Sequence, residues 1–362
     1  MLRIEMLPAE QGDALWIEYG AANKPRRFLI DGGTGASWDD GLRARIERQP
    51  ADERHFELLI VTHIDADHID GALKLLQDEE LGATFGEVWF NGWRHLPDTG
   101  LEELGPVAGE ELTDTIVGRD LPWNKAFGKR AVGVNPGGDL PRKELDGDLF
   151  LTVLSPTATQ LAKLKPKWKT VVEKAGLVPG ETREPTPPEE PPSGLEHLGA
   201  AQLPDVHALA DEPLDEDGAE ANGTSIVVLL EHDDRSVMLC GDAFPSVVEA
   251  AVDRLLVARD VDRLELNAFK LPHHGSAFNN SKTLLAKLAC PLFLFSTNGA
   301  HTKHPHPESV ARVLVTAEPG ASLLFNYRTG FNEVWDEQEL RDEFHYTPTY
   351  PAQGTKGLTV DL

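Results

Sequence analysis

Apolar and polar residues alternate along residues 2–6 and again along 14–19, on either side of a break at Gln11-Gly12-Asp13. A period of two is typical of half-buried β-strands, and the pair of segments indicates two adjacent antiparallel strands. Short apolar runs bounded by turn residues indicate further, more deeply buried strands. These runs fall at residues 27–30, 58–61, 87–93, 149–154, 226–231, 236–240, 264–271, 291–296 and 322–325.

Segments with a helical spacing of apolar residues lie between these runs. They cover residues 40–48, 69–76, 159–175, 247–256 and 308–317. Pro166 predicts a break inside the third of them, because proline has no backbone N–H to donate. The alternation of strands and helices is compatible with a mixed α/β domain.

Two stretches interrupt this alternation. Residues 94–147 give weak signals that are helical in part, consistent with a lid-like insertion over a site. Residues 178–220 begin with a proline-rich run and end in a strongly acidic one, a composition typical of a surface insertion. Because pieces of one site lie on both sides of it, we expect one domain over residues 1–330, followed by a C-terminal tail over 331–362 to which we assign no function.

Four potential metal ligands occupy six positions directly after the apolar run at 58–61. They are His63, Asp65, Asp67 and His68. In extended chain alternate side chains point the same way, so the first three can converge while the fourth reaches them from the next helix. Two neighbouring ions can share four such ligands more comfortably than one ion can. A solvated helix N-terminus would explain the aspartates but neither histidine.

This segment resembles the His-x-His/Asp-x-Asp-His signature of the metallo-β-lactamase superfamily. The start of the chain resembles it too, in a Gly-Asp pair before one strand and Asp31-Gly32-Gly33 after the next. For Asp31 we favour a supporting role, accepting hydrogen bonds from the histidine loop, over direct contact with metal. The downstream segments resemble the hydrolase domain of ComEC-type DNA-uptake proteins more than the β-lactamases themselves.

Two downstream segments carry that resemblance. Asn222 precedes a strand, a hairpin and a second strand that ends in Gly-Asp242, and the resemblance implies that Asp242 bridges two cations. A plain aspartate at a hairpin end is the alternative. Lys270 then begins a Lys-x-Pro-His-His-Gly-Ser segment, in which we expect His274 rather than His273 to bind metal.

The resemblance also implies residues that contact substrate. Ser276 and the backbone amides beside it would hold an oxyanion. An asparagine followed by His-Pro-His, here Asn298, His304 and His306, would contact a scissile phosphate or protonate a leaving group. Histidines that are merely polar surface residues remain the alternative. The implied substrate-binding residues are His273, Ser276, Asn222 and Asn298, and the implied catalytic residues are Asp67, His304 and His306.

The fold that the resemblance implies is an αββα sandwich, two mixed sheets face to face with helices outside and the site at one rim. The implied chemistry is hydrolysis by hydroxide bound to two divalent ions, zinc or manganese. The implied ligands are His63, Asp65, Asp67, His68, Asp242 and His274. The substrate would be a phosphodiester such as DNA, which makes the chain a phosphodiesterase or a nuclease.

Two alternatives stay open. A hydrolase of lactone, thioester or amide bonds would use the same metals but would not need His306. A non-catalytic partner in a multi-component system would use the metals only to stabilise its fold.

The chain departs from the superfamily pattern at two positions. Asp65 replaces the second histidine of the commoner signature, and this harder ligand tolerates manganese or iron alongside zinc. The histidine that usually precedes the bridging aspartate has no convincing counterpart, and Asn222 stands at that point. We therefore expect one of the two ions to be weakly held.

Composition limits the partners. The 34 basic and 60 acidic residues give a net charge of −26, so contact with nucleic acid must be local, metal-assisted or aided by a protein partner. Cys240 and Cys290 have no metal-binding spacing, and we expect reduced core thiols. Residues 1–6 lack the apolar core of a signal peptide, and no later segment has the length of a membrane span. We expect a soluble, cytoplasmic protein without membrane contact.

Overall fold

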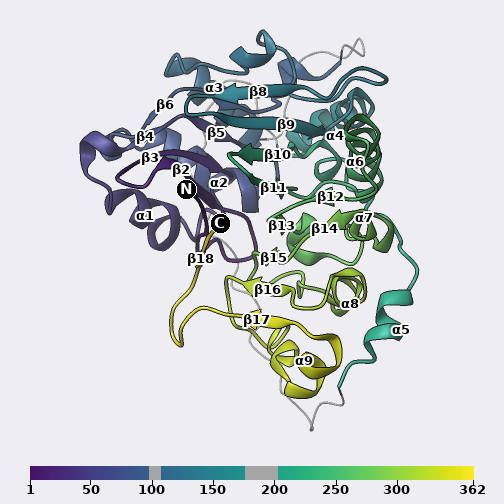
Figure 1. The fold of residues 1–362 in the computed structure, drawn as a ribbon. Coiled ribbons are helices and arrows are strands. Elements are labelled where there is room, and N and C mark those ends of the chain that lie inside the picture. The colour runs from purple at the N-terminus through teal and green to yellow at the C-terminus, as the bar shows by residue number, and fades with distance from the viewer. Residues whose placement is uncertain (98–106, 176–202) are drawn as a thin grey trace.

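Two large mixed sheets organise the computed structural model, which describes residues 1–97, 107–175 and 203–362 (Figure 1). The first sheet has the strand order β18 (Leu358–Asp361), β1 (Leu2–Met6), β2 (Leu15–Ala21), β3 (Lys24–Ile30), β5 (Leu58–Ile60) and β7 (Val88–Trp89). The second has the order β17 (Thr347–Thr349), β16 (Ser322–Phe325), β15 (Leu292–Phe295), β13 (Ala268–Lys270), β11 (Arg235–Leu239), β10 (Val227–His232), β9 (Leu149–Ser155) and β8 (Arg142–Leu145). Two short parallel pairs accompany them, β4 (His55–Phe56) with β6 (Thr84–Phe85), and β12 (Leu264–Glu265) with β14 (Leu288–Ala289).

Each sheet is antiparallel at one end and parallel at the other. Strands β1 and β2 form the predicted antiparallel pair, β3 extends it into a meander, and β5 and β7 then add in parallel. In the second sheet β8 to β11 are antiparallel, whereas β11, β13, β15, β16 and β17 run parallel. Parallel strands bring their carboxyl ends to one edge, which is where loops from both sheets meet.

The alternation of β1 and β2 sets the core between the sheets. Ile4 and Ile17 pair across the first sheet and join a buried apolar cluster with Leu151 and Val237 of the second sheet. Trp16 points to the opposite face, into a cluster that includes residues of the helices. Both faces of the first sheet are thus covered, as its apolar runs require.

Helices cover the outer faces of both sheets (Figure 1). Those on the first sheet are α1 (Ala44–Glu47), which continues a helical turn at Asp39–Arg43, α2 (Ala66–Gln77), α3 (Val107–Gly118) and α4 (Ala158–Ala175). Those on the second are α5 (Val206–Asp211), α6 (Pro245–Arg259), α7 (Lys282–Ala286), α8 (Pro307–Thr316) and α9 (Gln338–Phe344). The layer order confirms the predicted αββα sandwich.

Two predicted helix boundaries are wrong. Helix α2 begins at Ala66 rather than Ile69, with Asp65 at its N-cap, so Asp67 lies in the first helical turn and not in extended chain. His68 reaches the site from the start of the helix, as predicted. Helix α4 continues through Pro166. Its buried residues Leu161, Leu164 and Trp168 hold both halves against the first sheet, and this packing outweighs the lost hydrogen bond.

The predicted insertions and tail contribute ordinary secondary structure. Residues 94–147 supply α3, which packs beside α2, and β8 at the edge of the second sheet. Residues 98–106 and 178–202 of the insertions lie outside the described residues. The tail at 331–362 supplies α9 and places β17 and β18 at the edges of the two sheets. Cys240 and Cys290 are buried free thiols, as predicted.

Every helix in the described part of the chain is too short or too polar to span a lipid bilayer.

Helix α2 approaches the end of β3 so closely that only glycine fits at the contact. A Cβ atom on Gly71 would lie 1.9 Å from the carbonyl oxygen of Gly32, and one on Gly32 would lie 2.0 Å from the amide nitrogen of Ala72. The N–H of Gly32 donates to the carbonyl of His68 at 2.9 Å. The paired glycines therefore bring the start of α2 against the residue that follows β3, Asp31.

We expect Gly71→Ala to lower the free energy of unfolding by about 1–3 kcal/mol or more, because the methyl group must push α2 away from β3. Gly118→Ala is the matched control, since a Cβ atom there meets no atom within 4 Å. Urea denaturation of both variants measures the difference. Equal unfolding midpoints for the two variants would contradict the close contact.

Candidate metal centre

All six side chains predicted to bind metal, Asp65 among them, converge where the carboxyl ends of strands from both sheets meet. His63 follows β5, and Asp67 and His68 open α2. Asp242 follows β11, and His274 follows its parallel neighbour β13. These segments are far apart in the sequence, and the parallel pairing of the strands brings their ends to one rim.

One group of ligand atoms surrounds a common point beside α2. The Nε2 atoms of His68 and His274 lie 3.2 Å apart, and each faces Oδ1 of Asp242, at 3.3 and 3.6 Å. Oδ2 of Asp67 lies 3.9 Å from the first of these nitrogens and 3.5 Å from the second. Ligands about 2.1 Å from one ion are separated by roughly 3–3.6 Å, so this group has the dimensions of a coordination shell.

A second group shares the other oxygen of Asp242. Oδ2 of Asp242 lies 3.8 Å from Nε2 of His63 and 3.6 Å from Nε2 of His273. Asp65 is 3.5 Å from the same nitrogen of His63 and is partly exposed. Asp242 thus stands between two groups of donors with one oxygen toward each. His273, predicted to bind substrate, faces the same oxygen of Asp242 as His63 does.

The chemistry of these donors fits divalent cations. Oδ1 of Asp242 and Nε2 of His63 are buried, and neither has a hydrogen-bond partner in the described part of the chain. One ligand atom each from Asp13, His68, Asp242 and His274 lie within 4.8 Å of one another. Unpartnered imidazole nitrogens and carboxylate oxygens at such spacing are suited to zinc, manganese or iron.

The histidines are held by their other ring nitrogens. Asp31 accepts from Nδ1 of His68 at 2.8 Å and also from the amide of Thr62 at 2.7 Å. Nδ1 of His63 meets the hydroxyls of Thr62 and Ser225, at 3.0 and 3.2 Å. Such contacts fix the tautomer and leave Nε2 facing the centre. Asp31 therefore lies where a supporting residue is needed, beneath a ligand.

His274 rests on a buried ion pair. Its Nδ1 donates to the carbonyl of Ser296 at 2.9 Å and lies 3.4 Å from Oδ1 of Asp13. The ammonium of Lys270 contacts the other oxygen of Asp13, and both side chains are buried. Because Asp13 faces the Nδ1 side of the ring, it supports His274 instead of joining the ligands.

His273 is held by Asp217 of the acidic insertion together with two asparagines outside it. Oδ2 of Asp217 lies 3.3 Å from its Nδ1, and Oδ1 of Asn279 lies 2.9 Å from the same nitrogen. Asn222 and Asn279 in turn donate to Asp217, at 2.7 and 3.1 Å. A carboxylate behind an imidazole whose Nε2 faces the centre is the usual support of a metal-binding histidine.

Without cations the centre is a mutually compensating set of charges. Burial is the largest influence on Asp67 and opposes its ionisation, but His68 and His274 outweigh it and lower its pKa to about 2. Burial likewise opposes the charging of His274, but Asp242 and Asp13 outweigh it and raise its pKa to about 9. Bound cations would take over the role of these protons, because metal and proton compete for the same nitrogens.

The two histidines of the His-Pro-His turn differ in position. His304 is 3% exposed, and its ring lies 5.1 Å from that of His273 and 6.2 Å from that of His274. Burial, and after it the neighbouring His273 and His274, lowers its pKa to about 2, so it is a neutral imidazole. His306 is half-buried, and its Nδ1 accepts from the amide of Ala277 at 3.1 Å. His304 therefore faces the ligand histidines, whereas His306 joins two loops.

The remaining predicted substrate contacts lie around this centre in different ways. Ser276 is buried and accepts from the amide of Phe278 at 3.2 Å, within its own loop. Asn222 lies behind His273. Asn298 accepts from the amide of Ala300 at 2.9 Å in the loop after β15. Each of these contacts is to another group of the protein, and the roles of the three residues toward substrate stay predictions.

Sequence reasoning did not find several residues that support the ligands. They are Asp13, Thr62, Asp217, Ser225, Lys270 and Asn279. The Gly-Asp before β2 was a usable signal for Asp13, because it matched the superfamily pattern. Asp217 gave none, since it is one acid among many in a run that favours solvent.

Solved structures of similar fold are found for this chain, but no similar sequence. No protein-family profile and no curated protein sequence matches the chain. Solved structures similar to it include the diiron β-hydroxylase CmlA from Streptomyces venezuelae, at 12% identity and a TM-score of 0.43, where the match covers 99% of this chain and 54% of CmlA. Zn²⁺-bound PqqB from Methylobacterium extorquens is 10% identical over 100% of both chains, with a TM-score of 0.40. The short form of human tRNase Z is 9% identical over 100% of this chain and 99% of that one, with a TM-score of 0.39.

We expect Lys270→Met to lower the free energy of unfolding by about 3–5 kcal/mol, because it leaves the carboxylate of Asp13 buried without its cation. The double variant with Asp13→Asn should recover part of the loss. Lys287→Met, which breaks partly exposed pairs with Glu249 and Asp253, is the control and should cost no more than about 1 kcal/mol. Denaturant titration measures all three, and a single variant as stable as its control would contradict the buried pair.

We expect the wild type to bind two equivalents of Mn²⁺ or Zn²⁺, and His273→Ala to bind the second equivalent much more weakly. Asp217→Asn should weaken that equivalent by about 10–100-fold, the usual effect of losing the support of a ligand histidine. Asp215→Asn removes the same charge from an exposed neighbour and should leave affinity unchanged. Elemental analysis and metal titration give the result, and full affinity in His273→Ala would contradict this ligand.

Proposed function

We propose that this protein is a metal-dependent phosphodiesterase, with nuclease activity as its expected form. The observation that carries the proposal is Asp242, whose two oxygens face two separate groups of donors. A carboxylate in this position holds two cations at the close separation that hydrolysis of a phosphodiester uses. When bound, the cations supply an acidified water and neutralise charge on the phosphoryl oxygens.

The ligand side chains leave one side of the centre open to substrate. Asp65 and Asp67 are partly exposed, with 43% and 24% of their side chains accessible, whereas the histidines of the same segment are buried. Substrate therefore approaches from the side of these two aspartates. In this proposal Asp67, ionised at neutral pH, orients the attacking water by accepting its hydrogen bond.

His304 is suited to the leaving group or a phosphoryl oxygen. Its buried Nδ1 has no partner in the described part of the chain, and the ring adjoins two histidines of the centre. As a neutral imidazole it brings no charge of its own, and it gains proton affinity when an anionic phosphate enters. In this proposal His304 takes up a proton from water when the phosphate binds and gives that proton to the departing oxygen, and His306 holds the turn that positions it.

The test compares wild type with Asp242→Asn on single-stranded DNA, plasmid DNA, bis(p-nitrophenyl) phosphate and a lactone, each with Mn²⁺ and with Zn²⁺. We expect hydrolysis of the diesters by the wild type and a loss of at least 100-fold in the variant, because the shared ligand is gone. His304→Ala should lower diester hydrolysis by about 10²–10⁴-fold, the usual contribution of a general acid.

Other outcomes identify the alternatives. Hydrolysis of the lactone alone, unaffected by His304→Ala, would indicate an acyl hydrolase. Metal binding without turnover of any substrate would indicate a structural role for the ions. Equal activity of wild type and Asp242→Asn would mean that the activity belongs to a contaminant.

A further inference from the structure

A row of aromatic rings leads from the candidate metal centre to the surface. The ring of His273 meets that of His304 at 5.1 Å, His304 meets His306 at 4.5 Å, and His306 meets Phe278 at 5.8 Å, all edge to face. The row begins at a side chain that faces Asp242 and ends at a phenyl ring in solvent. A planar group joined to a phosphate at the centre would lie along this row.

Phe278 stands out because it is 45% exposed while the residues around it are buried. Ser276, Asn279 and Asn280, on either side of it, are 1% exposed or less. An apolar ring that served only to hold this loop would gain free energy by turning inward, at roughly 25 cal/mol per Å² removed from water. The loop keeps it outside.

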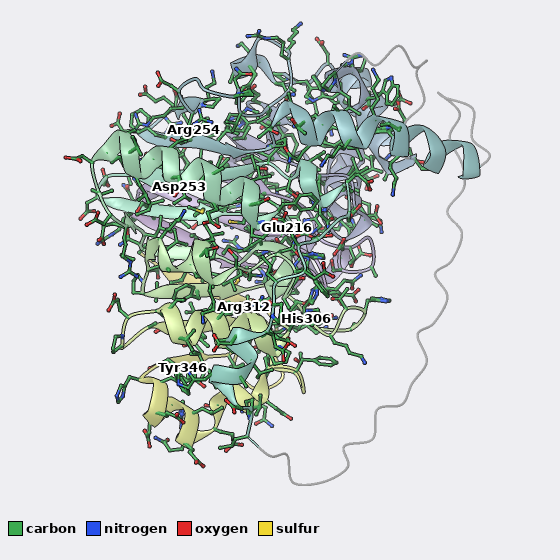
Figure 2. All side chains as sticks on the ribbon, turned by 90° about the vertical axis from the view of Figure 1, so that its right-hand side faces the viewer. Glu216, Asp253, Arg254, His306, Arg312 and Tyr346 are labelled. Atoms are coloured by element: carbon green, nitrogen blue, oxygen red, sulfur yellow. The ribbon has the colours of Figure 1, made fainter. Side chains whose placement is uncertain are left out.

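The backbone of this loop is fixed without help from the phenyl ring. Arg312 of α8 donates to the carbonyls of Ala277 and Asn280, at 2.6 and 2.9 Å, and is itself 2% exposed. The amide of Ala277 donates to His306, so Arg312 and His306, both labelled in Figure 2, each hydrogen-bond to the backbone of this loop. The carbonyl of Phe278 accepts from the amide of Asp217 at 3.2 Å. A rigid loop with an exposed ring is preorganised to bind a flat partner.

We propose that Phe278 stacks against a nucleobase attached to the scissile phosphodiester. This inference rests on the proposed function and narrows it to nucleotide-bearing diesters. It also accounts for recognition by so acidic a chain. Stacking uses the face of the base and needs no basic patch, so the net charge of −26, which repels a phosphate backbone, does not oppose it.

The test uses pairs of short single-stranded oligonucleotides. One member of each pair has an ordinary thymidine beside the cleaved bond, and the other has an abasic tetrahydrofuran residue there. One pair carries this residue on one side of the bond, and a second pair carries it on the other side. In the wild type kcat/KM should favour the base on one side by about 5–100-fold, the usual effect of one stacked base. Phe278→Ala should bring this ratio close to one while leaving the abasic substrate unchanged. Phe278→Tyr should keep the preference.

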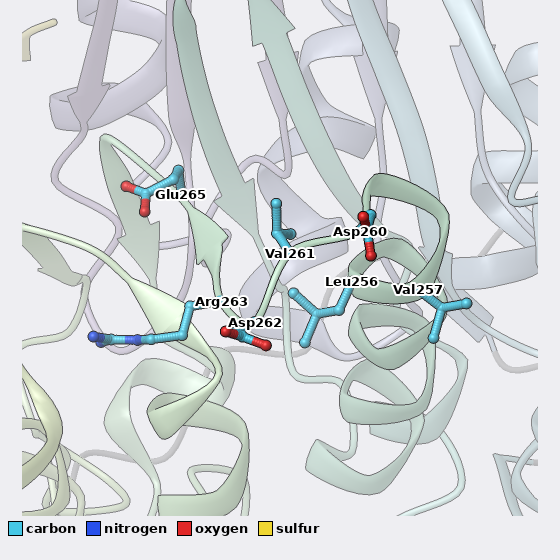
Figure 3. Close-up of a pocket in the computed structure, with 7 residues that line it drawn as sticks. All are labelled: Leu256, Val257, Asp260, Val261, Asp262, Arg263 and Glu265. Carbon is cyan, nitrogen blue, oxygen red and sulfur yellow. The ribbon is translucent and has the colours of Figure 1, made fainter.

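Val257→Ala is the matched control. Val257 is 83% exposed and lines a surface depression at the end of α6, together with residues such as Leu256 and Val261 (Figure 3). Its loss removes exposed apolar surface without touching the row of rings. The base preference of this variant should equal that of the wild type.

A readout independent of turnover comes from Phe278→Trp. Titration with dTMP should quench the new indole, whereas deoxyribose 5-phosphate should not. Equal losses on both oligonucleotides of a pair in Phe278→Ala, or a base preference that survives it, would overturn the inference and leave the phosphodiesterase intact. If the wild type cleaves none of the oligonucleotides, the proposed function fails. Quenching of the indole at position 278 by dTMP still decides whether a nucleobase binds at this position.

Discussion

The structure depends on the neutralisation of buried carboxylates, either by protonated histidines of the centre or by cations in place of those protons. Asp13, Asp67 and Asp242 are gathered with three histidines in a region from which water is largely excluded. Burying carboxylates so close together is costly unless positive charge lies among them. Lys270 compensates Asp13, and Asp31 holds His68, so the surrounding shell is satisfied by the chain itself. The two sides of Asp242 are left for cations.

The fold places the candidate ligands together because they follow strands that end at the same rim. The ligands follow β5, β11 and β13, strands of two different sheets, so no single supersecondary unit could form the centre. The glycine contact between β3 and α2 sets how near the first helical turn comes to Asp31. Rigid placement of this kind is what a preorganised site needs, because its donor atoms must keep their separation.

Local signals in the sequence, a period of two, short apolar runs and the dense ligand spacing after β5, were enough to predict most strands of the two sheets and the first four candidate ligands. The layer order, Asp242 and His274 came from the resemblance to a known superfamily, and β8, β17 and β18 were not predicted. Sequence reasoning misplaced the start of α2, since aspartates and histidines carry no apolar period, and it predicted a break at Pro166 that packing overrides. It assigned His274 to metal and His273 to substrate, whereas Nε2 of each ring lies 3.6 Å from an oxygen of Asp242, and the substrate role of His273 stays a prediction. Nothing local in the sequence indicates that Asp217, about 55 residues earlier, orients that ring.

If the centre binds cations as proposed, the contact of Asp217 with His273 makes the cation affinity depend on the conformation of the insertion. The backbone amide of Asp217 hydrogen-bonds to the carbonyl of Phe278, and its carboxylate contacts the ring of His273. A segment that is already ordered would raise the affinity of the centre for a cation. By linkage, a bound cation would stabilise the ordered segment by the same free energy. Occupancy and the conformation of residues around 217 therefore form a single reciprocal equilibrium, so that a molecule which grips this segment would also tune the metal content of the protein.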